Sequence, residues 1–281
     1  MTTPLSTLPT EPATAFTADW QAWHDELERS RRDPHGFLAY SSITLLDGTP
    51  RAIDGAPGLW STGPDGPRVD LPEGETIELD GITITGAHGF GPLEERQRRR
   101  ATWRDAVLEL SRRGGHDLLR PVHPESPRRT GYLGTPTFEP DPRWVVEGLF
   151  VPWDEPRDLS IDAAVDGIVH THTSPGVVEF TIDGVELSLV VFEGGPTPGS
   201  LFTVFTDATS GVSTYPASRA LHGFEVGDDS RVVLDFTRTS NLQCAYTPYS
   251  PCPLAPAQNR LPVAIEAGER TPHGDPRAAD D

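Results

Sequence analysis

The sequence contains no lysine, one methionine, two asparagines and two cysteines among its 281 residues. Two cysteines are too few for the disulfide framework of a secreted domain. No apolar run approaches the ~20 residues that a membrane-spanning helix needs. Residues 1–15 lack the basic and apolar regions of a signal peptide. These absences exclude a disulfide scaffold and a membrane-spanning helix, and they predict a cytoplasmic protein of bacterial type.

Several catalytic motifs are also missing. The chain has no Gly-x-Ser-x-Gly elbow, no phosphate-binding Gly-x-x-x-x-Gly-Lys loop and no Gly-x-Gly-x-x-Gly after a strand. A serine hydrolase, a nucleotide triphosphatase and a dinucleotide-dependent oxidoreductase are therefore disfavoured, and we predict no cofactor. The net charge of −19 repels phosphate backbones and anionic lipids, so we predict neither nucleic acid nor a membrane as a partner. The oligomeric state is open.

Turn signals and short alternating segments dominate the chain from residue 37 onward. Six Asp-Gly pairs occur, and Asp-Gly favours the positive φ angles of tight hairpin turns. Residues 76–85 and 178–189 alternate apolar and polar side chains around such pairs and predict two hairpins. Strand-like runs follow at 144–151, 177–182, 186–193, 201–206 and 231–236. The pattern predicts a mainly β protein with an antiparallel sandwich or barrel in its C-terminal half.

Two segments show helical spacing. Thr17 to about Arg32 predicts an N-terminal helix that docks through its tryptophans, and Asp33-Pro34 ends it. Pro92 to Arg113, followed by two glycines, predicts a connecting helix. Residues 116–142 are rich in proline and predict an irregular boundary. The predicted division is tails at 1–15 and 273–281, a unit at 16–125 with a helix, a small β unit and the connecting helix, and a β domain at 135–272.

Residue types that the chain otherwise avoids gather in one segment. Both asparagines, Asn241 and Asn259, and both cysteines, Cys244 and Cys252, lie between positions 241 and 259. Two of the five tyrosines, Tyr246 and Tyr249, lie there as well. A compositional bias does not explain this clustering, so we infer a local structural or chemical requirement.

The same region carries a resemblance to a known family. Leu201–Tyr215, Val233–Phe236 and most strongly Cys252–Glu269 are similar to the domain-of-unknown-function family 1684, and the similarity is clear over about residues 135–272. Members read Asp-Phe-Asn-Arg-Ala-Tyr-Asn-Pro-Pro-Cys where this chain reads Asp235-Phe-Thr-Arg-Thr-Ser-Asn-Leu-Gln-Cys244, so Thr237 replaces an asparagine. The family implies no activity, and function has to be argued from the residues.

The leading functional hypothesis is a site for a small anionic molecule, with acid–base catalysis by carboxylates as an extension. Arginine guanidinium groups bind carboxylate or phosphate with planar geometry, and a desolvated glutamate can act as a general base. The ligand-binding candidates are Tyr215, Arg219, Arg238, Asn241, Asn259 and Arg260, with Asp207 nearby, and the catalytic candidates are Asp235, Glu266 and Glu269. The alternative is a non-enzymatic structural or protein-interaction β module, in which these side chains pair with each other and hold loops together.

Two further groups of residues permit chemistry. Cys244 and Cys252 flank a seven-residue connection, and they are interpreted as buried, inert thiols, with a disulfide or a nucleophile as alternatives. His170 and His172 share one face of a predicted strand, a geometry that suits a metal. No third ligand with recognisable spacing follows, so we interpret them as surface histidines and predict no metal.

Overall fold

The computed structural model describes residues 13–195 and 197–274. Within them the chain is mainly antiparallel β-structure, arranged as sandwich-like sheets without a closed barrel. One long helix, α1 (Ala13–Arg31), and one single-turn helix, α2 (Pro127–Thr130), accompany the strands. No helix in this part of the chain has the length and apolar content needed to cross a membrane. The predicted tails lie outside the described residues, except that α1 begins at Ala13 and residues 273 and 274 are described.

The N-terminal β unit consists of two sheets that pack against each other. Its strands are β1 (Thr44–Leu45), β2 (Arg51–Ala52), β3 (Leu59–Gly63), β4 (Gly66–Asp70), β5 (Thr76–Leu79), β6 (Ile82–Thr85), β7 (Ala87–Gly89), β8 (Arg98–Trp103), β9 (Ala106–Arg113) and β10 (His116–Val122). One sheet has the order β1-β10-β9-β8-β5-β6 and the other β2-β3-β4-β7. Trp60, Ile77 and Leu108 are buried between them and form the core.

The C-terminal β unit is one larger, strongly bent sheet. Its strands are β11 (Val145–Asp162), β12 (Val169–Ile182), β13 (Val185–Glu193), β14 (Leu201–Phe205), β15 (Arg219–Phe224), β16 (Arg231–Asp235) and β17 (Ser240–Asn241), in the order β16-β11-β12-β13-β14-β15-β17. Phe180, Phe205 and Phe236 lie at its core. The strands predicted in this half are therefore confirmed, with β11 and β12 longer than expected.

Both predicted Asp-Gly hairpins are present. Strands β5 and β6 pair around Asp80-Gly81, and β12 and β13 pair around Asp183-Gly184. Both residues of each turn have a positive φ, which is the conformation that favours this pair.

The connecting helix predicted for Pro92 to Arg113 is wrong. The segment forms β8 and β9, joined by a turn in which Arg104 has a positive φ. Strand β9 is paired on both sides and nearly continuously buried, including its polar residues Glu109 and Ser111, so it is not the half-buried strand that an alternating pattern indicates. The two glycines that suggested a helix end form the β9–β10 hairpin turn, and His116–Val122 is a strand where irregular structure was expected.

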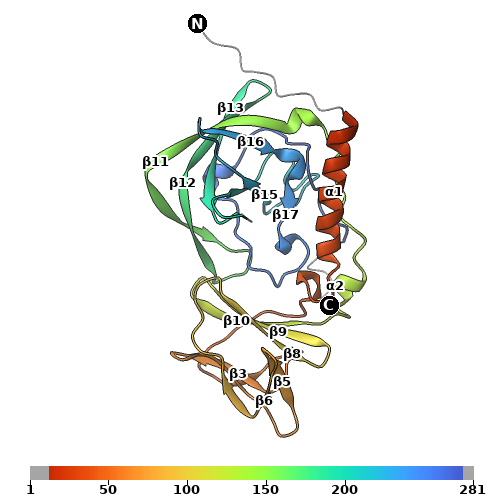
Figure 1. Cartoon of the computed structure of the whole chain (residues 1–281), viewed down its shortest axis with the longest axis vertical. Helices are drawn as coiled ribbons and strands as arrows, with labels where there is room; N and C mark the ends of the chain where they lie inside the picture. The colour runs from red at the N-terminus through yellow and green to blue at the C-terminus, as the bar shows by residue number, and fades with distance from the viewer. Residues whose placement is uncertain (1–12, 196, 275–281) are drawn as a thin grey trace.

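Helix α1 packs on the C-terminal unit, although it begins the chain. Figure 1 shows α1 beside β15–β17, with the N-terminal β unit at the other end of the molecule. Trp20 is buried, and its indole N–H donates to the backbone oxygen of Thr237 at 2.7 Å. The predicted docking role of this tryptophan is confirmed, and the helix brings its polar face to the segment that the sequence singled out.

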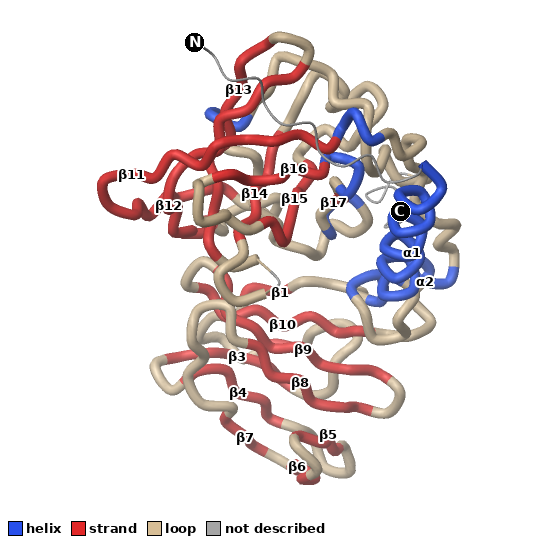
Figure 2. The backbone as a smooth tube through the Cα atoms, turned by 45° about the horizontal axis from the view of Figure 1, so that its top comes forward, coloured by secondary structure: helices blue, strands red, loops and turns tan. Residues whose placement is uncertain are grey.

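The two β units meet through the β9–β10 turn and the start of β12. Figure 2 shows β1 and β10 directly beneath the C-terminal unit. A side chain on Gly114 would place its Cβ 2.6 Å from the backbone oxygen of Val169, so only glycine fits this contact. Arg96 donates to the backbone oxygen of Thr171 and to Nδ1 of His172.

His170 and His172 are buried at this contact, which corrects the interpretation that they are surface histidines. Their rings do share one face of β12, with centroids 5.8 Å apart. His172 packs against Phe192 and Phe202 and accepts from Arg96 of the N-terminal unit, and the spacing of residues within one strand does not reveal these contacts.

Candidate functional site

Two of the sequence-predicted site residues belong to a buried polar cluster, called the Glu269 cluster below. It joins α1, the segment around Thr135 and the end of the chain. Its members are His24, Glu28, Arg31, Tyr132, Thr135, Asn241, Tyr246 and Glu269. Only Asn241 and Glu269 among them were predicted. The signal for the others is that His24, Glu28 and Arg31 follow helical spacing on one face of α1.

Glu269 is completely buried and is held by several donors. Arg31 binds it in a bidentate pair, with Nη1 2.5 Å from Oε1 and Nη2 2.8 Å from Oε2. The backbone N–H of Asn241 donates to Oε2 at 2.7 Å, and the Tyr246 hydroxyl donates at 3.3 Å. Both carboxylate oxygens of Glu269 are therefore occupied by donors of the fold itself.

Burial and hydrogen bonds shift the pKa values of the residues around Glu269. Burial alone would lower the pKa of Arg31, but its hydrogen bonds to Glu269 raise that pKa overall. Burial would raise the pKa of Glu28, whereas hydrogen bonds from Tyr132 and Arg31 lower it overall. Burial raises the pKa of Tyr246 well above its ordinary value. These shifts favour the charged forms of Glu28 and Arg31 and the neutral form of Tyr246.

His24, Glu28 and Glu269 offer one ligand atom each within 4.8 Å of one another, which is close enough to hold a metal ion. The donor set does not fit a resident cation, however, because Arg31 already occupies both oxygens of Glu269. Arg31 also donates to Glu28 at 2.9 Å, and Arg32 lies 3.6 Å from the same carboxylate. Two positive charges at the two carboxylates leave a divalent ion little electrostatic gain.

Arg219 forms a second buried polar contact. Its Nη2 donates to Oδ2 of Asp207 at 2.7 Å and to the backbone oxygen of Ile265 at 3.0 Å, and Nη1 donates to that of Ala267 at 2.6 Å. Asp207 also accepts from the hydroxyl and N–H of Thr209. Burial lowers the pKa of Arg219, whereas Asp207 opposes that shift. The pair fastens the last described segment to β15.

Three other candidates connect loops to strands. Asn259 is buried, accepts from the N–H of Val190 and donates to three oxygens on β13 and β14. Asn241 pairs with Arg219 across β17 and β15 and donates to the backbone oxygen of Arg270. Tyr215 donates to the backbone oxygen of Cys244 at 2.9 Å.

The remaining candidates lie near or at the surface. Arg238 pairs with Asp19 of α1 and with Asp235, whose other oxygen accepts from the N–H and hydroxyl of Thr237. Arg260 and Glu266 are exposed. The predicted arginines therefore have three separate sets of neighbours, and the predicted glutamates differ completely in exposure.

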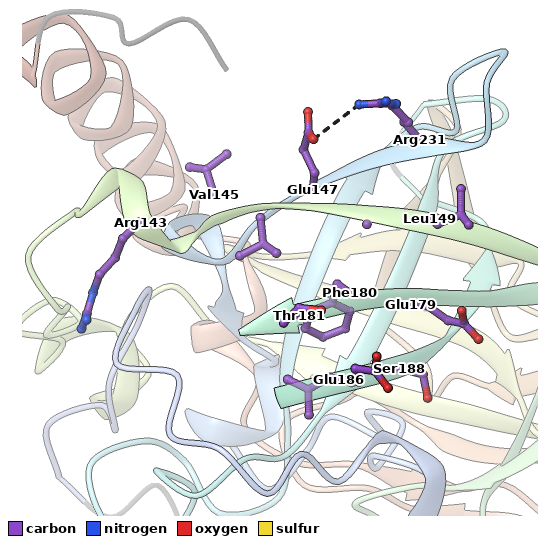
Figure 3. Close-up of a pocket in the computed structure, with 13 residues that line it drawn as sticks. Arg143, Val145, Glu147, Leu149, Glu179, Phe180, Thr181, Glu186, Ser188 and Arg231 are labelled. Carbon is purple, nitrogen blue, oxygen red and sulfur yellow. Dashed lines mark ion pairs between the residues drawn. The ribbon is translucent and has the colours of Figure 1, made fainter. Parts of the chain in front are cut away.

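A groove that the sequence did not predict lies on the C-terminal sheet, and we call it the acidic groove. It has a volume of about 950 Å³. Its lining residues come from η2 (Pro142–Trp144), β11, β12, β13 and β16: Arg143, Val145, Val146, Glu147, Gly148, Leu149, Glu179, Phe180, Thr181, Glu186, Leu187, Ser188 and Arg231. Figure 3 shows Glu147 and Arg231 above β11, with Phe180, Glu186 and Ser188 below it. The polar positions of the second hairpin were the available signal, because they form one face of β12 and β13.

The comparisons with known proteins concern the C-terminal half. The model of a family described as "Protein of unknown function (DUF1684)" matches residues 130–270. A solution NMR structure of an uncharacterized protein from Haloarcula marismortui is 27% identical, with a TM-score of 0.43, and the match covers 51% of this chain and 79% of that chain. None of the curated proteins compared with this chain matches it.

Proposed function

Given that the chain belongs to the DUF1684 family, described only as proteins of unknown function, we propose from its geometry that it is a binding module for an extended basic peptide segment. The peptide would lie in the acidic groove. The observation that carries the proposal is an open strand edge between acidic walls.

The open edge results from the divergence of β11 and β12. Their pairing stops at Gly148 opposite Phe180, while β11 continues to pair with β16 as far as Val145. Gly148 lets β12 approach closely, since a Cβ there would lie 2.6 Å from a methyl group of Val178. Beyond this point β11 has no ladder partner on its β12 side among the described residues. An extended peptide placed along such an edge continues the ladder through its backbone, as in β-strand addition.

The charges along the groove favour a cationic occupant. Arg143 lies 3.2 Å from Asp141, and Arg231 lies 3.0 Å from Asp229 and 3.5 Å from Glu147. These carboxylates already neutralise both arginines. Glu179 and Glu186 are exposed, and no ion pair within the described residues engages either of them. The net charge of the chain adds a long-range attraction for basic partners.

The apolar residues of the groove suit alternate side chains of a strand. Leu149 is 49% exposed beside the charged residues, and Phe180 and Val146 lie at the base of the groove. A peptide that alternates basic and apolar residues would place its two faces against these two kinds of surface.

The test is fluorescence anisotropy with a short labelled peptide that alternates lysine and valine. We expect saturable binding that weakens with added salt and in the double variant Glu179→Gln/Glu186→Gln. The matched control is Glu73→Gln, an exposed glutamate of the N-terminal unit. An acidic peptide of alternating glutamate and valine should not bind, and prolines at alternate positions of the basic peptide should abolish binding by removing backbone donors. Equal binding of all three peptides would contradict the proposal.

The predicted site for a small anionic molecule stays a second proposal. It has less support from the contacts of Arg219, whose donors are directed at Asp207 and two backbone oxygens. Arg260 is exposed, so its substitution tests for an anion site better than that of Arg219. A rise of the melting temperature with phosphate or citrate that Arg260→Gln abolishes would favour an anion site.

A cytoplasmic location is also our proposal. It is supported by the cysteine content, because two cysteines are too few for the disulfide framework of a secreted domain.

A further inference from the structure

Cys244 and Cys252 lie side by side in a small buried cluster. Neither is in a disulfide, and their exposed fractions are 4% and 9%. The cluster contains Leu38, Tyr215 and Tyr246, so it lies where the start of the chain meets the C-terminal segment. The chain has no other cysteine.

The backbone holds the two sulfur atoms together. The N–H of Cys244 donates to Sγ of Cys252 at 3.2 Å, and the two thiols are themselves hydrogen-bonded. The connection between them is fixed by the single-turn helix η4 (Gln243–Ala245) and by a hydrogen bond from the N–H of Cys252 to the backbone oxygen of Ser250. The two cysteines therefore contact each other on a short, ordered connection, which is the arrangement from which a disulfide can form.

The surroundings of Cys252 lower the pKa of its thiol. The hydrogen bond from the Cys244 thiol lowers the pKa of Cys252, burial opposes this, and backbone N–H groups and the charge of Arg120 lower the pKa further. A thiolate is the reactive form of cysteine towards oxidants. The geometry also distinguishes the two sulfurs, because Sγ of Cys252 accepts the backbone N–H of Cys244.

We propose that Cys244 and Cys252 are a reversible redox pair that a small peroxide converts into an intramolecular disulfide. The Cys252 thiolate attacks one peroxide oxygen, the O–O bond breaks, and a sulfenic acid forms while the other oxygen leaves as hydroxide. The Cys244 sulfur then attacks that sulfur, the S–S bond forms, and the sulfenic hydroxyl leaves as water after taking up a proton. The two thiols lose two electrons, the peroxide gains them, and two water molecules result. An external dithiol reverses the change.

The oxidation state would reach the rest of the fold through direct contacts. The backbone oxygen of Cys244 accepts from Tyr215, and that of Cys252 accepts from the N–H of Ala164. Tyr246, two residues after Cys244, belongs to the Glu269 cluster. A disulfide would fix the connection from which these contacts arise.

The test exposes the full-length protein to hydrogen peroxide, removes the peroxide, unfolds the protein in an alkylating reagent and counts alkylated cysteines by mass spectrometry. We expect two alkylated cysteines before oxidation, none afterwards with the loss of two hydrogens, and two again after dithiothreitol treatment of the oxidised sample. Retention of two alkylated cysteines after peroxide, a covalent dimer on a non-reducing gel, or sulfinic acid in place of the disulfide would overturn the proposal.

Single variants then assign the roles of the two sulfurs. Cys244→Ser should leave Cys252 as a sulfenic acid that dimedone traps, whereas Cys252→Ser should leave Cys244 alkylatable after the same treatment. Trapping at Cys244 and not at Cys252 would contradict the assigned order of attack.

Discussion

The Glu269 cluster and the acidic groove contain similar residue types in opposite physical states. In the cluster, Glu269 and Arg31 are buried and satisfy each other. In the groove, Glu179 and Glu186 are exposed, and no ion pair within the described residues engages them. The scarce residue types of the sequence went into the cluster and the contacts around it, whereas the groove is made of common ones. Both asparagines and both cysteines are buried, whereas the groove offers an open surface with unmatched charge and is the candidate for binding.

The largest expected effect comes from breaking the cluster. Glu269→Gln leaves the buried charge of Arg31 without its bidentate partner, and we expect the free energy of unfolding to fall by about 3 to 5 kcal/mol. Urea denaturation followed by tryptophan fluorescence measures the change.

Glu266→Gln is the matched control, because Glu266 lies three residues earlier and is exposed. Its free energy of unfolding should stay within about 0.5 kcal/mol of the wild type. Equal losses in the two variants would show that burial does not separate the two glutamates that the sequence predicted as catalytic.

The redox pair should give a smaller effect. In the chain-entropy account, a disulfide that closes a loop of this size stabilises the fold by about 2.5 kcal/mol. Thermal unfolding of the oxidised and reduced protein measures it, and the difference should vanish in Cys244→Ser. A lower melting temperature for the oxidised form would mean that the disulfide strains the connection next to Tyr246.

The pH dependence of the free energy of unfolding tests whether burial lowers the pKa of His172. Burial lowers the pKa of His172 to about 4, and Arg96 and His170 act in the same direction. Because the unfolded chain binds the proton more readily, this histidine should cost stability as the pH falls from about 6.5 to about 4, and nothing above that range.

His172→Gln should therefore make stability depend less on pH between those values. His170 and His222, whose pKa values are also lowered by burial, keep part of the slope. His116→Gln, at an exposed position of β10, should leave the slope unchanged. Identical slopes for the two variants would contradict the assignment to His172.

The smallest expected effect on stability is in the groove. Glu179→Gln/Glu186→Gln removes two exposed charges from β12 and β13. The free energy of unfolding should change by no more than about 0.5 kcal/mol. The same variant should lose affinity for the basic peptide. A marked loss of stability would mean that these glutamates, like Glu269, are needed to hold the fold together.

The sequence predicted local features better than their assembly. The Asp-Gly pairs gave both hairpins, because the pair and its positive φ angles belong to one short segment. The helix at Pro92 to Arg113 failed because β9 is buried on both faces, a consequence of its neighbours and not of its own pattern. Tertiary packing also buries His172, which the sequence had placed at the surface.

The candidate site shows the same limit. Asn241 was found because its segment has an unusual composition, and Glu269 because it ends the run Cys252–Glu269 that resembles the family. Arg31 was missed because it lies 238 positions from Glu269 in the sequence. The groove was missed because it depends on where β11 and β12 separate, which no residue pattern in either strand specifies.

The most direct test of this account is amide hydrogen exchange of the full-length protein with and without saturating basic peptide. The account predicts added protection at Val145–Leu149 and Thr181–Glu186, the two strand edges of the groove, and none around Glu269. Protection confined to residues 207–219 or 240–269 would contradict it, because the ligand would then bind at the sequence-predicted site residues and not in the acidic groove.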